Sequence, residues 1–116
     1  MNDKDETRDD AIRIYCARQN QEEYVAVEDR SNIRGTGRSN EESIGDLMRN
    51  VVVSLRPEYL NDRRLFIDGY ETKDGYAVIE TATGIRGSGS GEREALGSLM
   101  IALARQKPDL VSIEYR

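Results

Sequence analysis

Isoleucine or cysteine occupies alternate positions within the stretch 11–18, with polar or small residues between them. Alternation of this kind predicts a strand that buries one face. After a polar turn, the same spacing predicts a second strand over 24–28, in which Val25 and Val27 face the core. Residues 33–36 predict a short third strand that leads into a glycine.

The spacing of apolar residues then changes to that of a helix. Ser39 and Glu42 form the Ser-x-x-Glu pattern of a capping box, which predicts that a helix begins there. Apolar residues continue at helical spacing as far as Leu55 and form one stripe. Pro57 predicts that the helix ends near Leu55, because proline lacks the N–H that the next turn needs.

The second half of the chain predicts the same elements in the same order. Alternation predicts strands over 64–70 and 76–81, joined by a turn that contains the favoured Asp-Gly pair. A short strand is predicted over 85–88. A helix follows over 92–106, and a final strand is predicted over 110–115.

The two halves also share identical residues at one constant offset of 52 positions. The identical pairs are Tyr24/Tyr76, Glu28/Glu80, Ile33/Ile85, Arg34/Arg86, Gly35/Gly87, Gly37/Gly89, Glu42/Glu94, Gly45/Gly97, Leu47/Leu99 and Met48/Met100. A single offset without gaps is hard to obtain by chance, and we interpret it as an internal duplication.

These patterns predict an α+β fold of two tandem β-β-β-α repeats plus a C-terminal strand. We expect one mainly antiparallel sheet, with both helices on one of its faces and a pseudo-twofold axis between the repeats. Residues 1–10 are densely charged and predict a disordered tail. The first repeat is predicted over 11–62, and the second repeat, with the final strand, over 63–116, together as one compact domain.

Composition narrows the classes of function. The chain has no histidine, which removes histidine-based acid–base catalysis and almost every zinc arrangement. Cys16 is the single cysteine, so no internal disulfide can form, and its strand pattern predicts a buried, inert thiol. No apolar run of about 18 residues and no signal-peptide pattern is present, so we expect a cytoplasmic protein without a membrane partner. We predict no enzyme activity, no cofactor and no metal.

Paired glycines precede each predicted helix, at 35 and 37 and again at 87 and 89. Such loops can hold phosphate, but the Gly-x-Gly-x-x-Gly pattern is incomplete and glutamates occupy the first helical turns. We interpret these glycines as the corner where a strand turns sharply into a helix. Gly45 and Gly97 interrupt the helices at equivalent positions, which predicts a close approach of helix to sheet or helix to helix.

Charged pairs recur as well. Glu28 with Arg34, and Glu80 with Arg86, are predicted to face one another across hairpins as ion pairs on the side away from the helices.

In the predicted strands, aromatic residues and arginines occupy the alternate positions that face away from the helices. The predicted interaction face consists of Arg13, Tyr15, Tyr24, Arg34, Phe66, Tyr70, Tyr76 and Arg86. Tyrosine and arginine are enriched in protein interfaces, and they also stack on unpaired bases. The net charge of −5 favours a protein partner, with self-association as the leading form, over the alternative of a single-stranded nucleic-acid-binding protein.

Three stretches carry a family resemblance. Residues 74–80 read Asp-Gly-Tyr-Ala-Val-Ile-Glu, residues 84–89 read Gly-Ile-Arg-Gly-Ser-Gly, and residues 92–96 read Glu-Arg-Glu-Ala-Leu. This order resembles the N-terminal module of HicB-type antitoxins. The resemblance covers residues 64–115 well and residues 11–70 more loosely.

What the resemblance implies is a β-β-β-α-β module with a partial ribonuclease-H-like fold and no nuclease activity. Modules of that family neutralise a small partner toxin. The chain looks like two such modules fused, which would imitate within one chain the dimer that single modules form between chains.

Overall fold

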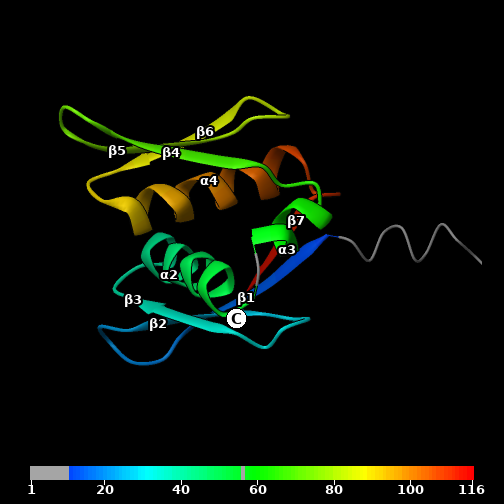
Figure 1. The fold of residues 1–116 in the computed structure, drawn as a ribbon. Coiled ribbons are helices and arrows are strands. Elements are labelled where there is room, and N and C mark those ends of the chain that lie inside the picture. Colours follow the sequence, from blue (N-terminus) through cyan, green and yellow to red (C-terminus); the bar gives the residue numbers. More distant parts are fainter. Residues whose placement is uncertain (1–10, 56) are drawn as a thin grey trace, which may run out of the picture.

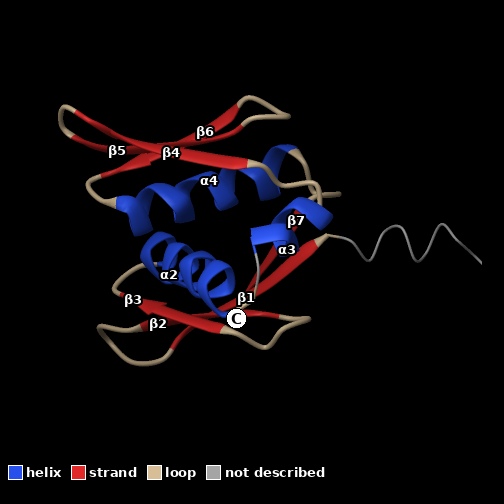
Figure 2. Cartoon of the chain, in the orientation of Figure 1, coloured by secondary structure: helices blue, strands red, loops and turns tan. Residues whose placement is uncertain are grey.

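The computed structural model describes residues 11–55 and 57–116, in which the chain forms three helices and two sheets of an α+β fold. The predicted disordered tail at residues 1–10 lies outside the described residues. The elements stack as sheet, helix, helix, sheet (Figure 1). Figure 2 shows the two strand layers on the outside and the two long helices between them.

One sheet combines the first three strands with the last strand of the described chain. Its members are β1 (Ile12–Arg18), β2 (Tyr24–Glu28), β3 (Arg34–Gly37) and β7 (Val111–Tyr115). Their order is β3-β2-β1-β7, and β7 runs parallel to β1 whereas the other neighbours are antiparallel. The final strand therefore crosses from the second half of the chain to the sheet of the first half.

The other sheet is antiparallel and has the order β4-β5-β6. Its strands are β4 (Ile67–Thr72), β5 (Gly75–Glu80) and β6 (Ile85–Gly89). A two-residue turn of Lys73 and Asp74 joins β4 to β5, close to where the sequence predicts it.

The helices fill the space between the sheets. Helix α2 (Asn40–Ser54) packs on β2 and β3, helix α4 (Glu92–Gln106) packs on β5 and β6, and the two helices contact each other. A short helix, α3 (Pro57–Asp62), follows α2 and was not predicted. The prediction of one sheet with both helices on one face is wrong, because each helix covers a sheet of its own.

The core lies between the two sheets and takes its side chains from both halves. Its largest fully buried apolar members are Ile12, Ile14, Ile44, Leu47, Met48, Val51, Leu65, Leu99, Met100 and Leu103. The predicted inward direction of Val25 and Val27 is wrong, because Ala26 and Glu28 are the buried residues of β2. A small residue and a carboxylate on the inner face concealed the true alternation of that strand.

The mid-helix glycines lie where α2 and α4 cross. A Cβ added at Gly45 would overlap the backbone of Arg93, and a Cβ added at Gly97 would overlap the backbone of Glu41. The contact is reciprocal, because each glycine meets the residue four positions before the other. The predicted close approach is therefore helix on helix.

The paired glycines lie where each strand turns into its helix, since β3 ends at Gly37 and α2 begins at Asn40. Gly35 lies beneath α2, where an added Cβ would meet the backbone of Leu47, and Gly87 lies in the same way against Leu99 of α4. Neither glycine has a positive φ, so their role is to let a helix lie directly on a strand. The interpretation that they hold structure and not phosphate remains a prediction.

The two long helices begin differently. Ser39 Oγ accepts a hydrogen bond from the N–H of Glu42 at 3.1 Å, which confirms the predicted cap of α2. At the start of α4 the equivalent position is Gly91, which offers no side-chain acceptor.

Replacing Gly91 by serine should therefore stabilise the protein. Nothing lies within 4 Å of a Cβ at this position, and its extended backbone suits any residue. We expect the free energy of unfolding to rise by about 0.5 kcal/mol, measured by urea denaturation. Gly91→Ala is the matched control, because it adds the Cβ without the hydroxyl. Equal stability of the two variants would contradict a cap.

Candidate functional site

The residues of the predicted interaction face do not share one surface. The outer face of the four-stranded sheet carries Arg13, Tyr15 and Arg34. The outer face of the three-stranded sheet, on the opposite side of the molecule, carries Tyr70 and Arg86, whereas Phe66 precedes β4 and lines a groove between β4 and α2. Tyr24 and Tyr76 point toward the helices, because they pair in register with Gly37 and Gly89, which lie under the helix starts. The prediction of a single Tyr/Arg face is wrong in its geometry.

The ring of Tyr15 is covered by a guanidinium. Arg116 lies 4.1 Å from the centre of the Tyr15 ring and forms an ion pair with Glu114 at 3.1 Å. Tyr15 and Arg13 also line a groove of about 780 Å³ beside β7. On this face of the sheet the tyrosine is already stacked by the chain itself.

The predicted cross-strand ion pairs are wrong. Glu80 is fully buried and faces inward, and its carboxylate accepts hydrogen bonds from the N–H groups of Phe66 at 3.0 Å, Thr83 at 2.8 Å and Ala82 at 3.4 Å. Arg86 lies on the opposite face of the sheet, next to Ile79. Burial by itself would raise the pKa of Glu80, but the hydrogen bonds from Thr83, Phe66 and Ala82 outweigh it and lower that pKa.

Glu28 plays the corresponding part in the first half. It is buried and accepts hydrogen bonds from the N–H of Ser31 at 2.9 Å, the N–H of Arg30 at 3.3 Å and the hydroxyl of Tyr59 at 2.8 Å. Burial and this bond to Glu28 raise the pKa of Tyr59 to about 12. Both glutamates thus close the turn that follows their strand.

Cys16 is buried in the core, as its strand pattern predicted. Burial raises the pKa of its thiol to about 11, so the thiol is protonated at neutral pH. Within residues 11–55 and 57–116, no three cysteine or carboxylate side chains are grouped so as to hold a metal ion. None of the helices in that part of the chain is long and apolar enough to cross a membrane.

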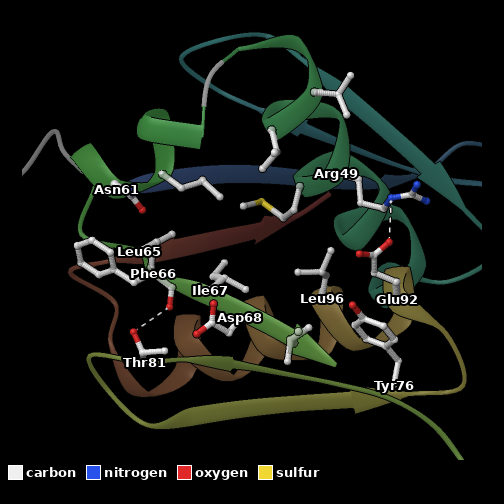
Figure 3. A pocket seen from close by; sticks show the side chains of 16 residues that line it. Arg49, Asn61, Leu65, Phe66, Ile67, Asp68, Tyr76, Thr81, Glu92 and Leu96 are labelled. Carbon is white, nitrogen blue, oxygen red and sulfur yellow. Dashed lines mark hydrogen bonds and ion pairs between the residues drawn. The ribbon is translucent and has the colours of Figure 1, made fainter. Parts of the chain in front are cut away.

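An open groove lies between α2, the segment around α3, and β4. Its volume is about 630 Å³, and the N-terminal half of α4 closes one end (Figure 3). Apolar side chains dominate its wall. They include Met48, Val52 and Val53 from α2, Leu65 and Phe66 from the approach to β4, and Leu96 from α4.

Much of the apolar surface that the described residues expose is found here. Val53 is 81% exposed, Phe66 is 43% exposed and Val52 is 39% exposed, and all three line the groove. Leu55, 38% exposed, follows them at the end of α2. Contiguous exposed apolar surface marks sites of interaction. The groove was missed in the sequence, although Val52 and Val53 stand off the buried stripe of their helix and were a signal.

Beside the groove runs a strand edge. In the described residues β4 pairs with β5 on one side and with no strand on the other. The carbonyl of Phe66 accepts the N–H of Thr81 at 2.8 Å, so alternate residues from Phe66 onward bond to β5. The backbone N–H and C=O groups of Ile67 and Gly69 therefore point to the open edge.

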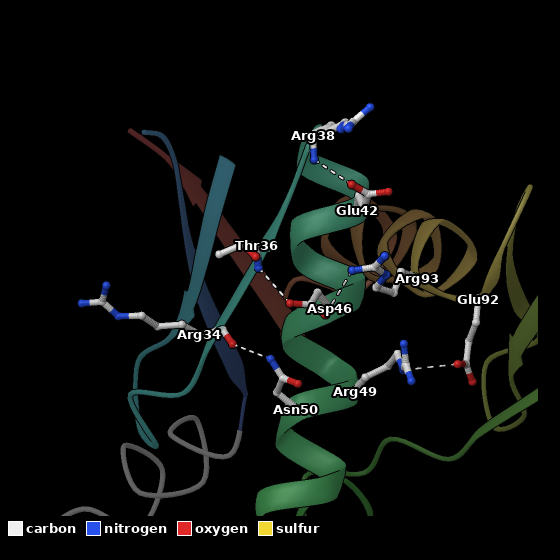
Figure 4. Close-up of polar contacts among 9 residues, drawn as sticks. All are labelled: Arg34, Thr36, Arg38, Glu42, Asp46, Arg49, Asn50, Glu92 and Arg93. Carbon is white, nitrogen blue, oxygen red and sulfur yellow. Dashed lines mark hydrogen bonds and ion pairs between the residues drawn. The ribbon is translucent and has the colours of Figure 1, made fainter. Parts of the chain in front are cut away.

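Charged residues hold α2 in place around the groove (Figure 4). Arg49 of α2 pairs with Glu92 of α4 at 3.3 Å, across one end of the groove. One turn earlier, Asp46 accepts the N–H of Thr36 at 2.9 Å and pairs with Arg93 at 3.5 Å. These contacts tie α2 to both β3 and α4.

No family model, no curated protein and no solved structure matches this chain.

Proposed function

We propose that the chain is a non-catalytic protein-binding module and that its partner docks in the groove beside β4. The observation that carries this proposal is the exposure of Val52, Val53 and Phe66 along an unpaired strand edge. Apolar anchors beside exposed backbone donors and acceptors suit a protein segment, which supplies both side chains and peptide groups.

The proposal includes an internal duplication with a pseudo-twofold axis between α2 and α4. The reciprocal contacts support it, since Gly45 meets Arg93 and Gly97 meets Glu41, and these residues correspond at the constant offset of 52. The two buried glutamates support it further, because each closes the turn after its own strand.

The resemblance to HicB-type modules extends the proposal to the kind of partner. It suggests a small toxin-like protein that this chain would neutralise. This extension rests on the resemblance alone, whereas the docking site rests on the groove.

A nucleic-acid-binding role has weaker support. It needs tyrosines and arginines together on one accessible face, and the fold divides them between two outer faces and the side toward the helices. We therefore favour the protein partner.

Replacing Val53 by aspartate should abolish capture of the partner. Val53 is largely exposed, so the fold should keep its stability, whereas a carboxylate buried in an apolar interface without a partner costs several kcal/mol. We expect a protein that co-purifies with the tagged wild type, from the cells that make it, to be reduced at least about tenfold with Val53→Asp.

Ser88→Asp is the matched control, because it adds the same charge at an exposed position on β6, outside the groove. Thermal unfolding of both variants checks that the fold is intact. Recovery of the same proteins by the wild type and Val53→Asp would contradict docking in the groove.

A further inference from the structure

We propose that the partner contributes an extended segment that adds to β4 as a parallel strand, in the position beside β4 that β7 occupies beside β1. This inference rests on the proposed function and specifies how the partner binds. The segment would pair with the open edge and place alternate side chains in the groove.

The open edge of β4 corresponds residue by residue to the edge of β1 that pairs with β7. Ile14 of β1 pairs in register with Glu28, and Ile67 of β4 pairs in register with Glu80, the equivalent glutamate of the second half. Counting from this pair, Cys16 corresponds to Gly69. In both strands, these alternate residues turn their backbone N–H and C=O groups away from the neighbouring antiparallel strand.

In the four-stranded sheet, β7 fills that edge. Ile113 lies in register beside Ile14, and Tyr115 lies beside Cys16. The strand also contacts α4, so it occupies the space between β1 and the second long helix. The corresponding space between β4 and α2 is the groove, whose floor in Figure 3 includes Ile67.

At both edges, the first backbone N–H that points away from the antiparallel neighbour is already bonded within the chain. The N–H of Ile12 bonds to the carbonyl of Leu110 at 2.9 Å, and the N–H of Leu65 bonds to the carbonyl of Leu60 at the same distance. After Leu110 the chain continues as β7, but after Leu60 it turns back through the end of α3. Within the described residues, no strand pairs with the edge beyond Leu65.

The residues along the open edge of β4 also determine which side chains the partner's segment should carry. The residue beside Ile67 faces the groove and should be apolar, as Ile113 is beside Ile14. The residue beside Asp68 lies on the outer face and should be basic, because opposite charges pair favourably across neighbouring strands. The Tyr76 ring lies over Gly69, where its Cε1 and hydroxyl oxygen would stand 2.9 Å from an added Cβ, so the partner's residue beside Gly69 would contact that ring.

This chemistry disfavours a second copy of the chain as the occupant. In β7 the residue at the position next to Asp68 would be Glu114, which would place two carboxylates side by side. The net charge of −5 also favours a basic partner. We therefore assign the edge to a cationic, extended segment of another protein.

Two peptides test the inference with the full-length protein. One has the sequence Leu-Val-Ser-Ile-Lys-Tyr-Arg, and the other has glutamate in place of lysine, as in the chain itself. We expect the lysine peptide to bind about fivefold more tightly, and the preference to reverse in the variant Asp68→Lys. Asp68 is exposed, so this variant should fold.

Amide hydrogen exchange locates the peptide. On binding, the N–H groups of Ile67 and Gly69 should exchange at least about tenfold more slowly, because they gain partners at the edge. The N–H of Asp68 already faces β5 and should change little. Protection elsewhere, or no protection at saturating peptide, would overturn strand addition. Tighter binding of the glutamate peptide would overturn the assignment to a cationic partner in favour of a second copy.

The outcome separates this inference from the proposed function. If capture of a protein depends on Val53 but the amides of Ile67 and Gly69 stay unprotected in that complex, docking in the groove stands and strand addition fails. If neither capture nor peptide binding depends on Val53, both proposals fail.

Discussion

Replacing Gly45 by alanine is expected to lower the free energy of unfolding by at least about 2 kcal/mol. In an ordinary helix the same change stabilises by about 1 kcal/mol, because alanine has the higher helix propensity. Here the new methyl group would overlap the backbone of Arg93 in the opposing helix. Backbone cannot move aside as a flexible side chain can, so α2 and α4 must separate and their packing is lost along the whole crossing.

Urea denaturation of wild type and variant measures this effect. Gly97→Ala should have a similar cost, because its methyl group would meet the backbone of Glu41 in the same way. Gly91→Ala is the control, since nothing lies near a Cβ there, and we expect a change within about 1 kcal/mol. An increase in stability for Gly45→Ala would show that the helices do not cross at this residue.

Replacing Glu80 by glutamine is expected to cost about 2 kcal/mol at neutral pH. The carboxylate is buried and accepts three backbone N–H groups, those of Ala82 and Thr83 in the turn that follows β5 and that of Phe66 before β4. An amide keeps one acceptor oxygen and turns an NH₂ group toward the remaining donors. At least one buried backbone N–H is then left without a partner.

The loss of unfolding free energy caused by Glu80→Gln should depend on pH, and its direction follows from the pKa of Glu80. Because the folded pKa of Glu80 lies below the ordinary value of 4.5, its ionised form stabilises the fold above that value. The stabilisation is lost as the pH falls through the lowered, folded pKa. The difference in unfolding free energy between wild type and Glu80→Gln should therefore be largest near neutral pH and should decrease at acidic pH.

Urea denaturation at a series of pH values from about 7 to about 3 tests this dependence. Glu71→Gln is the matched control, because Glu71 lies on β4 with its side chain exposed. A constant difference between wild type and Glu80→Gln over the whole range would show that the carboxylate is not held ionised by its turn.

Local structure followed closely from the sequence. The predicted bounds of the helix at 92–106 match α4, and the alternation at 11–18 predicted β1 to within one residue. Both depend on neighbours in the chain, through helical spacing, strand alternation and caps. Helix α3 was missed because its apolar residues are too few to form a stripe, although proline followed by an acidic residue suits a helix start.

The arrangement of these elements in space could not be predicted from the sequence. Two β-β-β-α units can share one sheet or form two, and the spacing of apolar residues is the same in both cases. The reciprocal glycines were the one local sign that helix would face helix. Tyr24 and Tyr76 were placed on the wrong face because their strands bury glutamates, which the alternation assigned to solvent.

The pairing of β7 with β1 bears on the order in which the chain is made. β1 is synthesised before the other strands of its sheet, and its parallel neighbour begins only at Val111. Until that segment leaves the ribosome, the edge of β1 stays open beside an apolar row that includes Ile12 and Ile14. Contacts that span nearly the whole chain also slow folding, because a long loop must close before they form. The nascent protein therefore passes through a stage at which both of its sheets have an unpaired edge of the same kind, and among the described residues a strand later pairs only with the edge of β1.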